Sequence, residues 1–150
     1  MIPRNKLLFL CTGNYYRSRF AEELFNHLAA QKGLDWVAAS RGLAQEFGLL
    51  RNLGHMSSLA VQHLENHQVK LSPKRSPRKL QPGEAREYQI IIALNRDEHE
   101  PLIAEHYPEL SNVVYWDIKD LGDEPAAQAL GRLEGKIETL VAQFEAERGH

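Results

Sequence analysis

The fold is decided by the stretch Leu7-Leu8-Phe9-Leu10-Cys11-Thr12-Gly13-Asn14-Tyr15-Tyr16-Arg17-Ser18. Its apolar beginning predicts a buried β-strand over Lys6–Cys11. Apolar side chains then recur at helical spacing, which predicts an amphipathic helix over Arg17–Ala30. The only cysteine of the chain, Cys11, is therefore expected at the carboxyl end of a strand, facing the start of a helix. Ligands of parallel sheets, and anions in particular, bind at such places.

Short apolar runs and helical patterns alternate along the rest of the chain. Further strands are expected over Trp36–Ser40, Gln89–Leu94 and Val113–Trp116, and further helices over His55–His67, Arg96–Glu105 and Ala126–Glu147. The run Gln89–Leu94 is continuous and β-branched, which indicates burial on both faces of a sheet. Loops are expected over Arg41–Leu53 and over the basic, proline-containing segment Lys70–Pro82. The alternation predicts an α/β fold, with a parallel sheet covered by helices on both faces.

Composition narrows the class of protein. A chain of 150 residues fits one domain over positions 1–150. The net charge of −2 gives no general attraction to nucleic acid or anionic membranes. No apolar run is long enough to span a bilayer, and the N-terminus lacks the pattern of a signal peptide. A single cysteine excludes an internal disulfide and argues against a cysteine-based zinc site. We therefore expect a cytoplasmic monomer or weak dimer without a nucleic-acid or membrane partner.

The segment around Cys11 has the chemistry of a phosphate site. Its backbone N–H groups can turn inward over Thr12–Tyr16, and Arg17 can bridge two phosphate oxygens. A helix N-terminus and a cation favour the thiolate form of a cysteine, which is a good nucleophile. Ser18 can donate its hydroxyl to the sulfur. We expect a phosphoryl group to pass to Cys11 and to be hydrolysed from it. The predicted phosphate-binding set is Thr12, Gly13, Asn14, Tyr15, Tyr16 and Arg17.

A departing alkoxide or phenoxide also needs a proton donor, which accelerates such a step by about 10²–10⁴-fold. The segment after the fourth expected strand offers Asp117, Asp120 and Asp123. Asp123 also stands where it can help cap the last helix. The residues alone do not choose among these three carboxyl groups.

The signature from Leu10 to Ser18 strongly resembles that of the low-molecular-weight protein tyrosine phosphatase family, which shares its fold with thioredoxin-coupled arsenate reductases. The resemblance covers nearly the whole chain and fits a divergent, bacterial-type member. It implies a three-layer sandwich with a four-stranded parallel sheet in the order 2-1-3-4. It also implies a cysteinyl-phosphate intermediate and no metal or other cofactor.

The resemblance also implies roles for individual residues. Cys11 would be the nucleophile and Arg17 the phosphate clamp. Asn14 would hold the shape of the loop, and Ser18 would bond to the thiolate. Ser40 would belong to the network that supports Asn14.

The family's general acid is an Asp followed by Pro. Alignment of the fourth strand favours Asp120 for this role, with Asp117 as the alternative. Leu121 then replaces the proline, and Arg19 stands where the family usually has another proline.

The resemblance also implies an aromatic residue that follows the general acid and lies beside the ring of a phosphotyrosine. No tyrosine follows Asp120 in this chain. Aromatic contact with a substrate is expected from Tyr15, Tyr16 or Phe47 instead. Arg75 falls near the position of a histidine that supports the site in eukaryotic members.

The expected function is a phosphomonoesterase acting on a phosphorylated protein or a small phosphate ester. Two alternatives stay open: arsenate reduction with an external thiol, since the chain holds no second cysteine, and a phosphate-binding module that has lost turnover. Rhodanese-like sulfur transfer ranks last. His63 and His67 form an i,i+4 pair, but two histidines without a third ligand do not predict a metal site. The basic segment Lys70–Lys79 is expected to be solvated rather than to dock a partner.

Overall fold

The sheet is parallel and four-stranded, in the order β2-β1-β3-β4. The computed structural model describes residues 3–50, 52, 54–120 and 122–148. The strands are β1 (Asn5–Cys11), β2 (Trp36–Gly42), β3 (Ile90–Ala93) and β4 (Val114–Tyr115). The predicted fold class and strand order are therefore confirmed, with β1 at the centre between β2 and β3.

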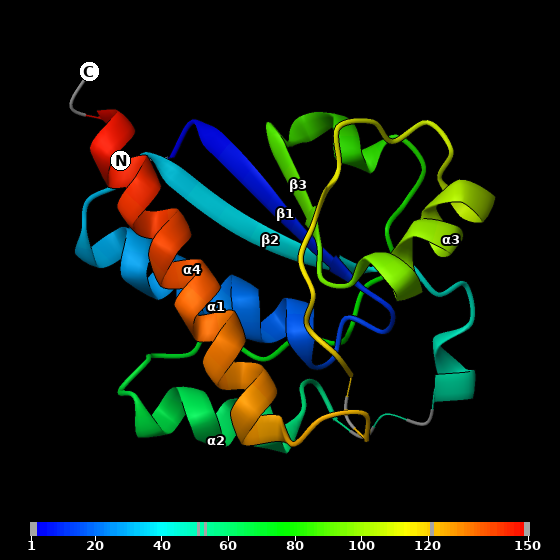
Figure 1. Cartoon of the computed structure of the whole chain (residues 1–150), viewed down its shortest axis with the longest axis horizontal. Helices are drawn as coiled ribbons and strands as arrows, with labels where there is room; N and C mark the ends of the chain where they lie inside the picture. The colour runs from blue at the N-terminus through cyan, green and yellow to red at the C-terminus, as the bar shows by residue number, and fades with distance from the viewer. Residues whose placement is uncertain (1–2, 51, 53, 121, 149–150) are drawn as a thin grey trace.

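Helices cover both faces of this sheet. They are α1 (Arg17–Gln31), α2 (Ser58–Asn66), α3 (Arg96–His106) and α4 (Ala126–Arg148), with short 3₁₀ turns η1 (Phe47–Leu50) and η2 (Glu84–Glu87). Figure 1 shows α1, α2 and α4 on one side of the strands and α3 on the other. This arrangement is the three-layer sandwich that the sequence predicts.

The alternation of side chains along β1 explains the two layers of core. Leu7 and Phe9 belong to the larger cluster, which packs under α1, α2 and α4. Leu8 and Leu10 belong to the smaller cluster, which packs toward α3. Because successive strand residues point to opposite faces, β1 is buried on both sides.

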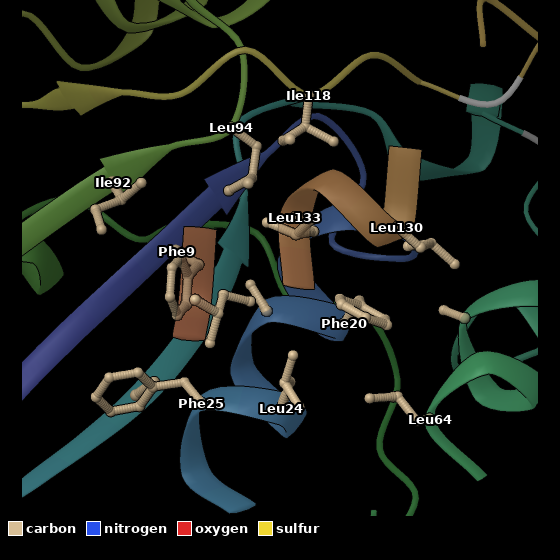
Figure 2. Packing of buried hydrophobic residues seen from close by; sticks show 14 of the residues in the cluster. Phe9, Phe20, Leu24, Phe25, Leu64, Ile92, Leu94, Ile118, Leu130 and Leu133 are labelled. Carbon is tan, nitrogen blue, oxygen red and sulfur yellow. The ribbon is translucent and has the colours of Figure 1, made fainter. Parts of the chain in front are cut away.

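Aromatic side chains fill the larger cluster. Figure 2 shows Phe9 and Phe25 beside the strands, and Phe20 among the helices near Leu130. Phe9 and Phe25 meet edge to face with ring centroids 6.3 Å apart, and Phe25 meets Phe144 of α4 at 6.0 Å. Such pairs add about 0.5–1.5 kcal/mol beyond the burial of their area. The strand that ends at Cys11 is therefore held firmly from the helical side.

The strand bounds differ from the sequence prediction: β1 begins at Asn5 instead of Lys6, β3 is Ile90–Ala93 instead of Gln89–Leu94, and β4 is Val114–Tyr115 instead of Val113–Trp116. The second strand continues to Gly42 instead of ending at Ser40, because its last residues pair with the end of β1. In β3 only Ile92 and Ala93 are buried, whereas Ile90 and Ile91 are half-buried. The cause is the shortness of β4, which pairs with Ile92 and Ala93 alone. The expectation of burial on both faces was therefore wrong for the first half of this strand.

Two further expectations concern the chain as a whole. Among the described residues, no helix is both long and apolar enough to cross a membrane. The assignment of positions 1–150 to a single domain stays a prediction.

Candidate active site

The loop between β1 and α1 directs its carbonyl groups away from its own centre. The carbonyl oxygen of Thr12 accepts from the N–H of Ala44 at 3.0 Å, and that of Tyr15 accepts from the N–H of Ser57 at 2.9 Å. Carbonyls that point outward fit a loop whose N–H groups turn inward, which is the form of an anion-binding nest.

Asn14 fixes the shape of this loop. It adopts a left-handed φ of 51°, which asparagine tolerates better than most residues, and it is fully buried. Its amide nitrogen donates to Ser18 Oγ at 2.9 Å and to Ser40 Oγ at 2.8 Å. Its amide oxygen accepts from Arg75 at 3.0 Å and from the N–H of Arg78 at 2.9 Å. The structure thus brings Asn14, Ser18 and Ser40 together, and the roles that the resemblance implies for them stay predictions.

Two arginines take part in this support at positions where the resemblance implies a histidine and a proline. Arg75, near the expected position of the supporting histidine, also donates to Ser40 Oγ at 3.0 Å and pairs with Glu22 at 3.0 Å. Arg19, in place of the usual proline, is buried and pairs with Glu22 at 3.2 Å and Glu23 at 3.3 Å. Because these cations are paired with carboxylates, the fold accommodates both departures.

Cys11 lies at the floor of the loop, with only 2% of its surface exposed. Its sulfur is 2.9 Å from Ser18 Oγ. Since Ser18 Oγ accepts a hydrogen bond from Asn14, its own proton is available to the sulfur. A hydroxyl that donates to sulfur stabilises a thiolate. Cys11 opens on a cavity of about 240 Å³ that Tyr15, Tyr16 and Asp120 also line.

Arg17 is buried beside the same cavity with one of its donors unused. One terminal nitrogen donates to Glu98 at 3.0 Å and to the carbonyl of Ile118 at 3.0 Å, and the other donates to Glu98 at 2.6 Å. Its Nε is buried and has no hydrogen-bond partner among the residues that the structure describes. Leaving a buried donor unsatisfied costs about 1–3 kcal/mol. This donor is therefore suited to an anion that enters the cavity.

Glu98 is a residue beside the site that sequence reasoning missed, as are Leu50 and Asn52, which line the cavity. Glu98 lies in the first turn of α3, where Asn95 caps the helix by accepting from the N–H of Glu98 at 3.0 Å. Its carboxylate also accepts from the hydroxyl of Thr12 and lies 3.1 Å from His99 Nε2. It is not part of the cavity lining and reaches the site through its contacts with Arg17 and Thr12. Acidic residues are common in the first turn of a helix, where they interact favourably with the helix dipole. The local sequence therefore gives no signal that Glu98 contacts Arg17.

Burial and the neighbouring donors shift the pKa of Glu98 in opposite directions. Burial alone would raise the pKa of Glu98, but hydrogen bonds from His99, Arg17 and Thr12, with the charge of Arg17, hold it well below its usual range. Burial lowers the pKa of His99, which favours a neutral ring. The carboxylate is therefore charged at neutral pH and compensates the buried cation of Arg17.

The two candidate acids separate in space. Asp120 lines the cavity with Cys11, and one of its oxygens is 3.6 Å from a terminal nitrogen of Arg17. Asp117 instead faces Asn95 at 3.4 Å and lines a different hollow together with Asp123. The geometry favours Asp120. Leu121, the expected replacement for the family's proline, lies outside the described residues.

The aromatic residues separate in the same way. Tyr15 and Tyr16 line the cavity. Burial, together with the charge of Asp120, raises the pKa of Tyr16 to about 12, so its phenol stays neutral. Phe47 packs against Gly42 and is not part of the cavity lining, so the structure does not place it at the site.

The fold recurs in solved structures. A low molecular weight protein tyrosine phosphatase from T. tengcongensis is 26% identical with a TM-score of 0.75, over 93% of this chain and 99% of that one. The YwlE arginine phosphatase from Geobacillus stearothermophilus is 22% identical with a TM-score of 0.73, over 96% and 95%. A thioredoxin-dependent arsenate reductase from Corynebacterium glutamicum is 19% identical with a TM-score of 0.68, over 97% and 64%.

The sequence comparisons agree with the geometry of the cavity. No curated protein sequence matches the chain at a significant level. Residues 6–148 match the model of the family described as low molecular weight phosphotyrosine protein phosphatase. Because this match spans nearly the whole chain, the protein belongs to the low molecular weight phosphotyrosine protein phosphatase family, a family of cysteine-dependent hydrolases.

Proposed function

We propose that this phosphatase hydrolyses phosphotyrosine-like aryl phosphates with Cys11 as nucleophile, Arg17 as phosphate clamp and Asp120 as general acid. The observation that carries the proposal is a single cavity. It is lined by Cys11, whose buried sulfur can accept from Ser18, by Arg17, whose buried Nε has no hydrogen-bond partner among the described residues, and by Asp120.

The first step transfers the phosphoryl group to the enzyme. The phosphate oxygens accept from the loop N–H groups and from Arg17 Nε. Cys11 Sγ attacks phosphorus opposite the ester oxygen, so that an S–P bond forms as the P–O bond to the leaving group breaks. The departing oxygen takes its proton from Asp120, which is worth about 10²–10⁴-fold in rate.

The second step returns the enzyme to its starting state. A water molecule attacks phosphorus, Asp120 takes one of its protons, and the S–P bond breaks. Ser18 donates to the thiolate that leaves, at the 2.9 Å contact seen here. Inorganic phosphate departs, and the carboxyl group of Asp120 is protonated again.

Glu98 serves this chemistry as a positioning residue. It accepts hydrogen bonds from both terminal nitrogens of Arg17, which leaves Nε as the guanidinium donor without a partner among the described residues. Its negative charge also compensates the buried guanidinium in the absence of phosphate. A bidentate carboxylate fixes the plane of a guanidinium, which a single hydrogen bond does not.

The substrate preference follows from the walls of the cavity. Tyr15 and Tyr16 offer aromatic contact to the ring of a phosphotyrosine, and the volume of about 240 Å³ suits one such side chain. Small aryl phosphates fit the same space. The cytoplasmic location and the monomeric or weakly dimeric state stay predictions.

Kinetics on three variants test the proposal. Phosphotyrosine peptide, phosphoarginine peptide, phenyl phosphate and p-nitrophenyl phosphate are compared near pH 6. Cys11→Ser is expected to abolish turnover. Asp120→Asn is expected to lower kcat on phenyl phosphate by about 10²–10⁴-fold, and less on p-nitrophenyl phosphate with its better leaving group. Asp117→Asn, the matched control, is expected to stay within about threefold, since it lies outside the cavity.

The same panel decides among the alternatives. Turnover by Cys11→Ser would overturn the mechanism, and a larger loss in Asp117→Asn would overturn the choice of acid. A wild type without phosphatase activity that reduces arsenate with added thiol would favour arsenate reduction. Phosphate binding without either activity would favour the binding module. Preference for the phosphoarginine peptide would correct the substrate class while leaving the three roles intact.

A further inference from the structure

Three potential metal ligands meet where α2 lies against α4, outside the lining of the phosphate cavity. His63 is in α2, His67 follows its last residue, and Glu134 comes from α4. His63 Nε2 is 3.2 Å from one carboxylate oxygen of Glu134, and His67 Nε2 is 3.6 Å from the other. One ligand atom from each residue lies within 4.8 Å of the others. Figure 1 shows the first turns of α4 beside α2.

We propose that His63, His67 and Glu134 bind a divalent transition-metal ion, with zinc as the best fit. The third ligand, which the i,i+4 pair lacks in the sequence, is supplied by a helix 71 positions away from His63. Two histidines, one carboxylate and a water molecule form the usual ligand set of an open zinc site.

The distances suit an ion of this kind. Nitrogen and oxygen ligands lie about 2.0–2.2 Å from zinc, so two ligands at a tetrahedral angle are about 3.3 Å apart. Each histidine nitrogen lies close to that spacing from its own oxygen of Glu134, at 3.2 Å for His63 and 3.6 Å for His67. The histidine rings are nearly parallel, at 12°, so His67 must tilt to aim its nitrogen at a shared ion. Half of its side chain is exposed, which leaves room for that rotation.

The surroundings prepare both rings for coordination. Nδ1 of His67 lies 2.9 Å from the carbonyl oxygen of His63 and donates to it, which leaves Nε2 as the nitrogen with a free lone pair. Such a bond from the second nitrogen is the common support of metal-binding histidines. The ring of Phe20 meets that of His63 edge to face at 5.3 Å and limits its movement. Imidazole donors favour zinc, copper or nickel over magnesium or calcium.

The alternative interpretation is that His63, His67 and Glu134 form only an ordinary surface ion pair. The pair of His106 and Glu105 is a control for this interpretation. His106 Nε2 lies 3.6 Å from a carboxylate oxygen of Glu105, the same distance as in the pair of His67 and Glu134. Among the described residues, the three-ligand grouping occurs only at His63, His67 and Glu134. A histidine beside one carboxylate does not bind zinc tightly, whereas three convergent ligands do.

An ion bound at this site would link α2 to α4, the two helices that flank the phosphate loop. The helix α2 begins after Ser57, whose N–H donates to the carbonyl of Tyr15 in that loop. The helix α4 begins at Ala126, a few residues after Asp120. An ion bound only by the folded protein raises Tm, by roughly 5–10 °C when its concentration is about 100 times its Kd.

Calorimetric titration with zinc chloride, in the Cys11→Ser background, tests the proposal. That background removes the thiolate, which itself binds zinc. One zinc per chain is expected, together with the strong visible absorption of tetrahedral cobalt when Co²⁺ is the probe. His67→Gln and Glu134→Gln are expected to weaken binding by at least ~10-fold, as loss of ligand-shell groups does. His106→Gln is expected to bind as the parent does.

The zinc affinities of the parent and of the variants decide whether the proposal holds. Circular dichroism first checks that each variant is folded, which is expected because His67 and His106 lie at the surface. Equal zinc affinity in the parent, His67→Gln and Glu134→Gln would overturn the proposal, as would the absence of binding to the parent. Loss of phosphatase activity plays no part in this readout, so the proposal is independent of the assigned catalytic roles.

Discussion

Replacement of Glu98 by glutamine tests whether the Glu98 carboxylate holds the Arg17 side chain in place. The change keeps the size of the side chain but removes the charge that faces Arg17. It also puts an amide N–H against a guanidinium N–H in place of one of the two hydrogen bonds. We expect Glu98→Gln to be less stable than the wild type and to bind phosphate in a less defined orientation.

The size of the effect follows from the contacts. A hydrogen bond to a charged partner contributes about 1.5–3 kcal/mol, and removal of one partner from a buried ion pair costs about 3–5 kcal/mol. Water reaches part of this pair, because 32% of the Glu98 side chain is exposed, so the lower range applies. We therefore expect the free energy of unfolding to fall by about 1.5–3 kcal/mol at pH 7. A misdirected clamp is expected to lower kcat/KM by roughly 10–100-fold.

The sign of the pH dependence follows from the lowered pKa of Glu98. A carboxyl group with a lowered pKa in the folded state stabilises the fold fully above its ordinary pKa of about 4.3. That contribution is lost as the pH falls below this value toward the folded pKa. The difference between wild type and Glu98→Gln is therefore expected to be largest at neutral pH and to shrink below about pH 4.

Urea unfolding at pH 7 and at lower pH, with steady-state kinetics, measures both effects. Glu100→Gln is the matched control, because Glu100 lies on the same helix and forms an exposed ion pair with Arg96. Exposed pairs of this kind contribute about 0.3–0.5 kcal/mol. If Glu98→Gln unfolds and turns over like Glu100→Gln, the assignment of Glu98 as the support of Arg17 is refuted.

Two further substitutions test the frame of the loop. Asn14→Ala removes four hydrogen bonds and puts alanine at a φ of 51°. It is expected to cost about 3 kcal/mol or more in denaturant unfolding and to impair turnover strongly, and an unchanged kcat would contradict the role of Asn14. Gly42→Ala places a Cβ 2.8 Å from the carbonyl oxygen of Thr12 and 2.5 Å from Phe47, so Tm should fall by several degrees. Gly131→Ala, in α4 with open space around it, should raise Tm instead, and equal shifts in both variants would contradict the crowding at Gly42.

Local sequence was enough for the phosphate loop because its parts are neighbours in the chain. An apolar strand, a loop and an amphipathic helix follow one another from Lys6 to Ala30, and this order alone brings Cys11, Arg17 and Ser18 close together, whereas the orientation of the Arg17 side chain depends on Glu98. The regular elements could be located for the same reason, since each depends on its own hydrophobic period.

Contacts between distant segments were not accessible to this reasoning. Glu98 stands 81 positions from Arg17, and only the pairing of β3 with β1 brings α3 beside the loop. Glu134 meets His63 only because α4 packs along α2. The exposure of Ile90 depends in turn on the length of β4, which is a property of the neighbouring strand and not of β3 itself. Hydrophobic patterns predict elements, whereas side-chain pairs across elements depend on packing.

The central claim is that a phosphoryl group passes through Cys11. Wild-type enzyme mixed with phenyl phosphate, quenched in acid within the first turnovers and digested, is examined by mass spectrometry. One added phosphoryl group is expected on the peptide that contains Cys11, and no such mass in Cys11→Ala. Steady turnover with the phosphoryl group on another residue, or with no phosphorylated enzyme at any quench time, would contradict it.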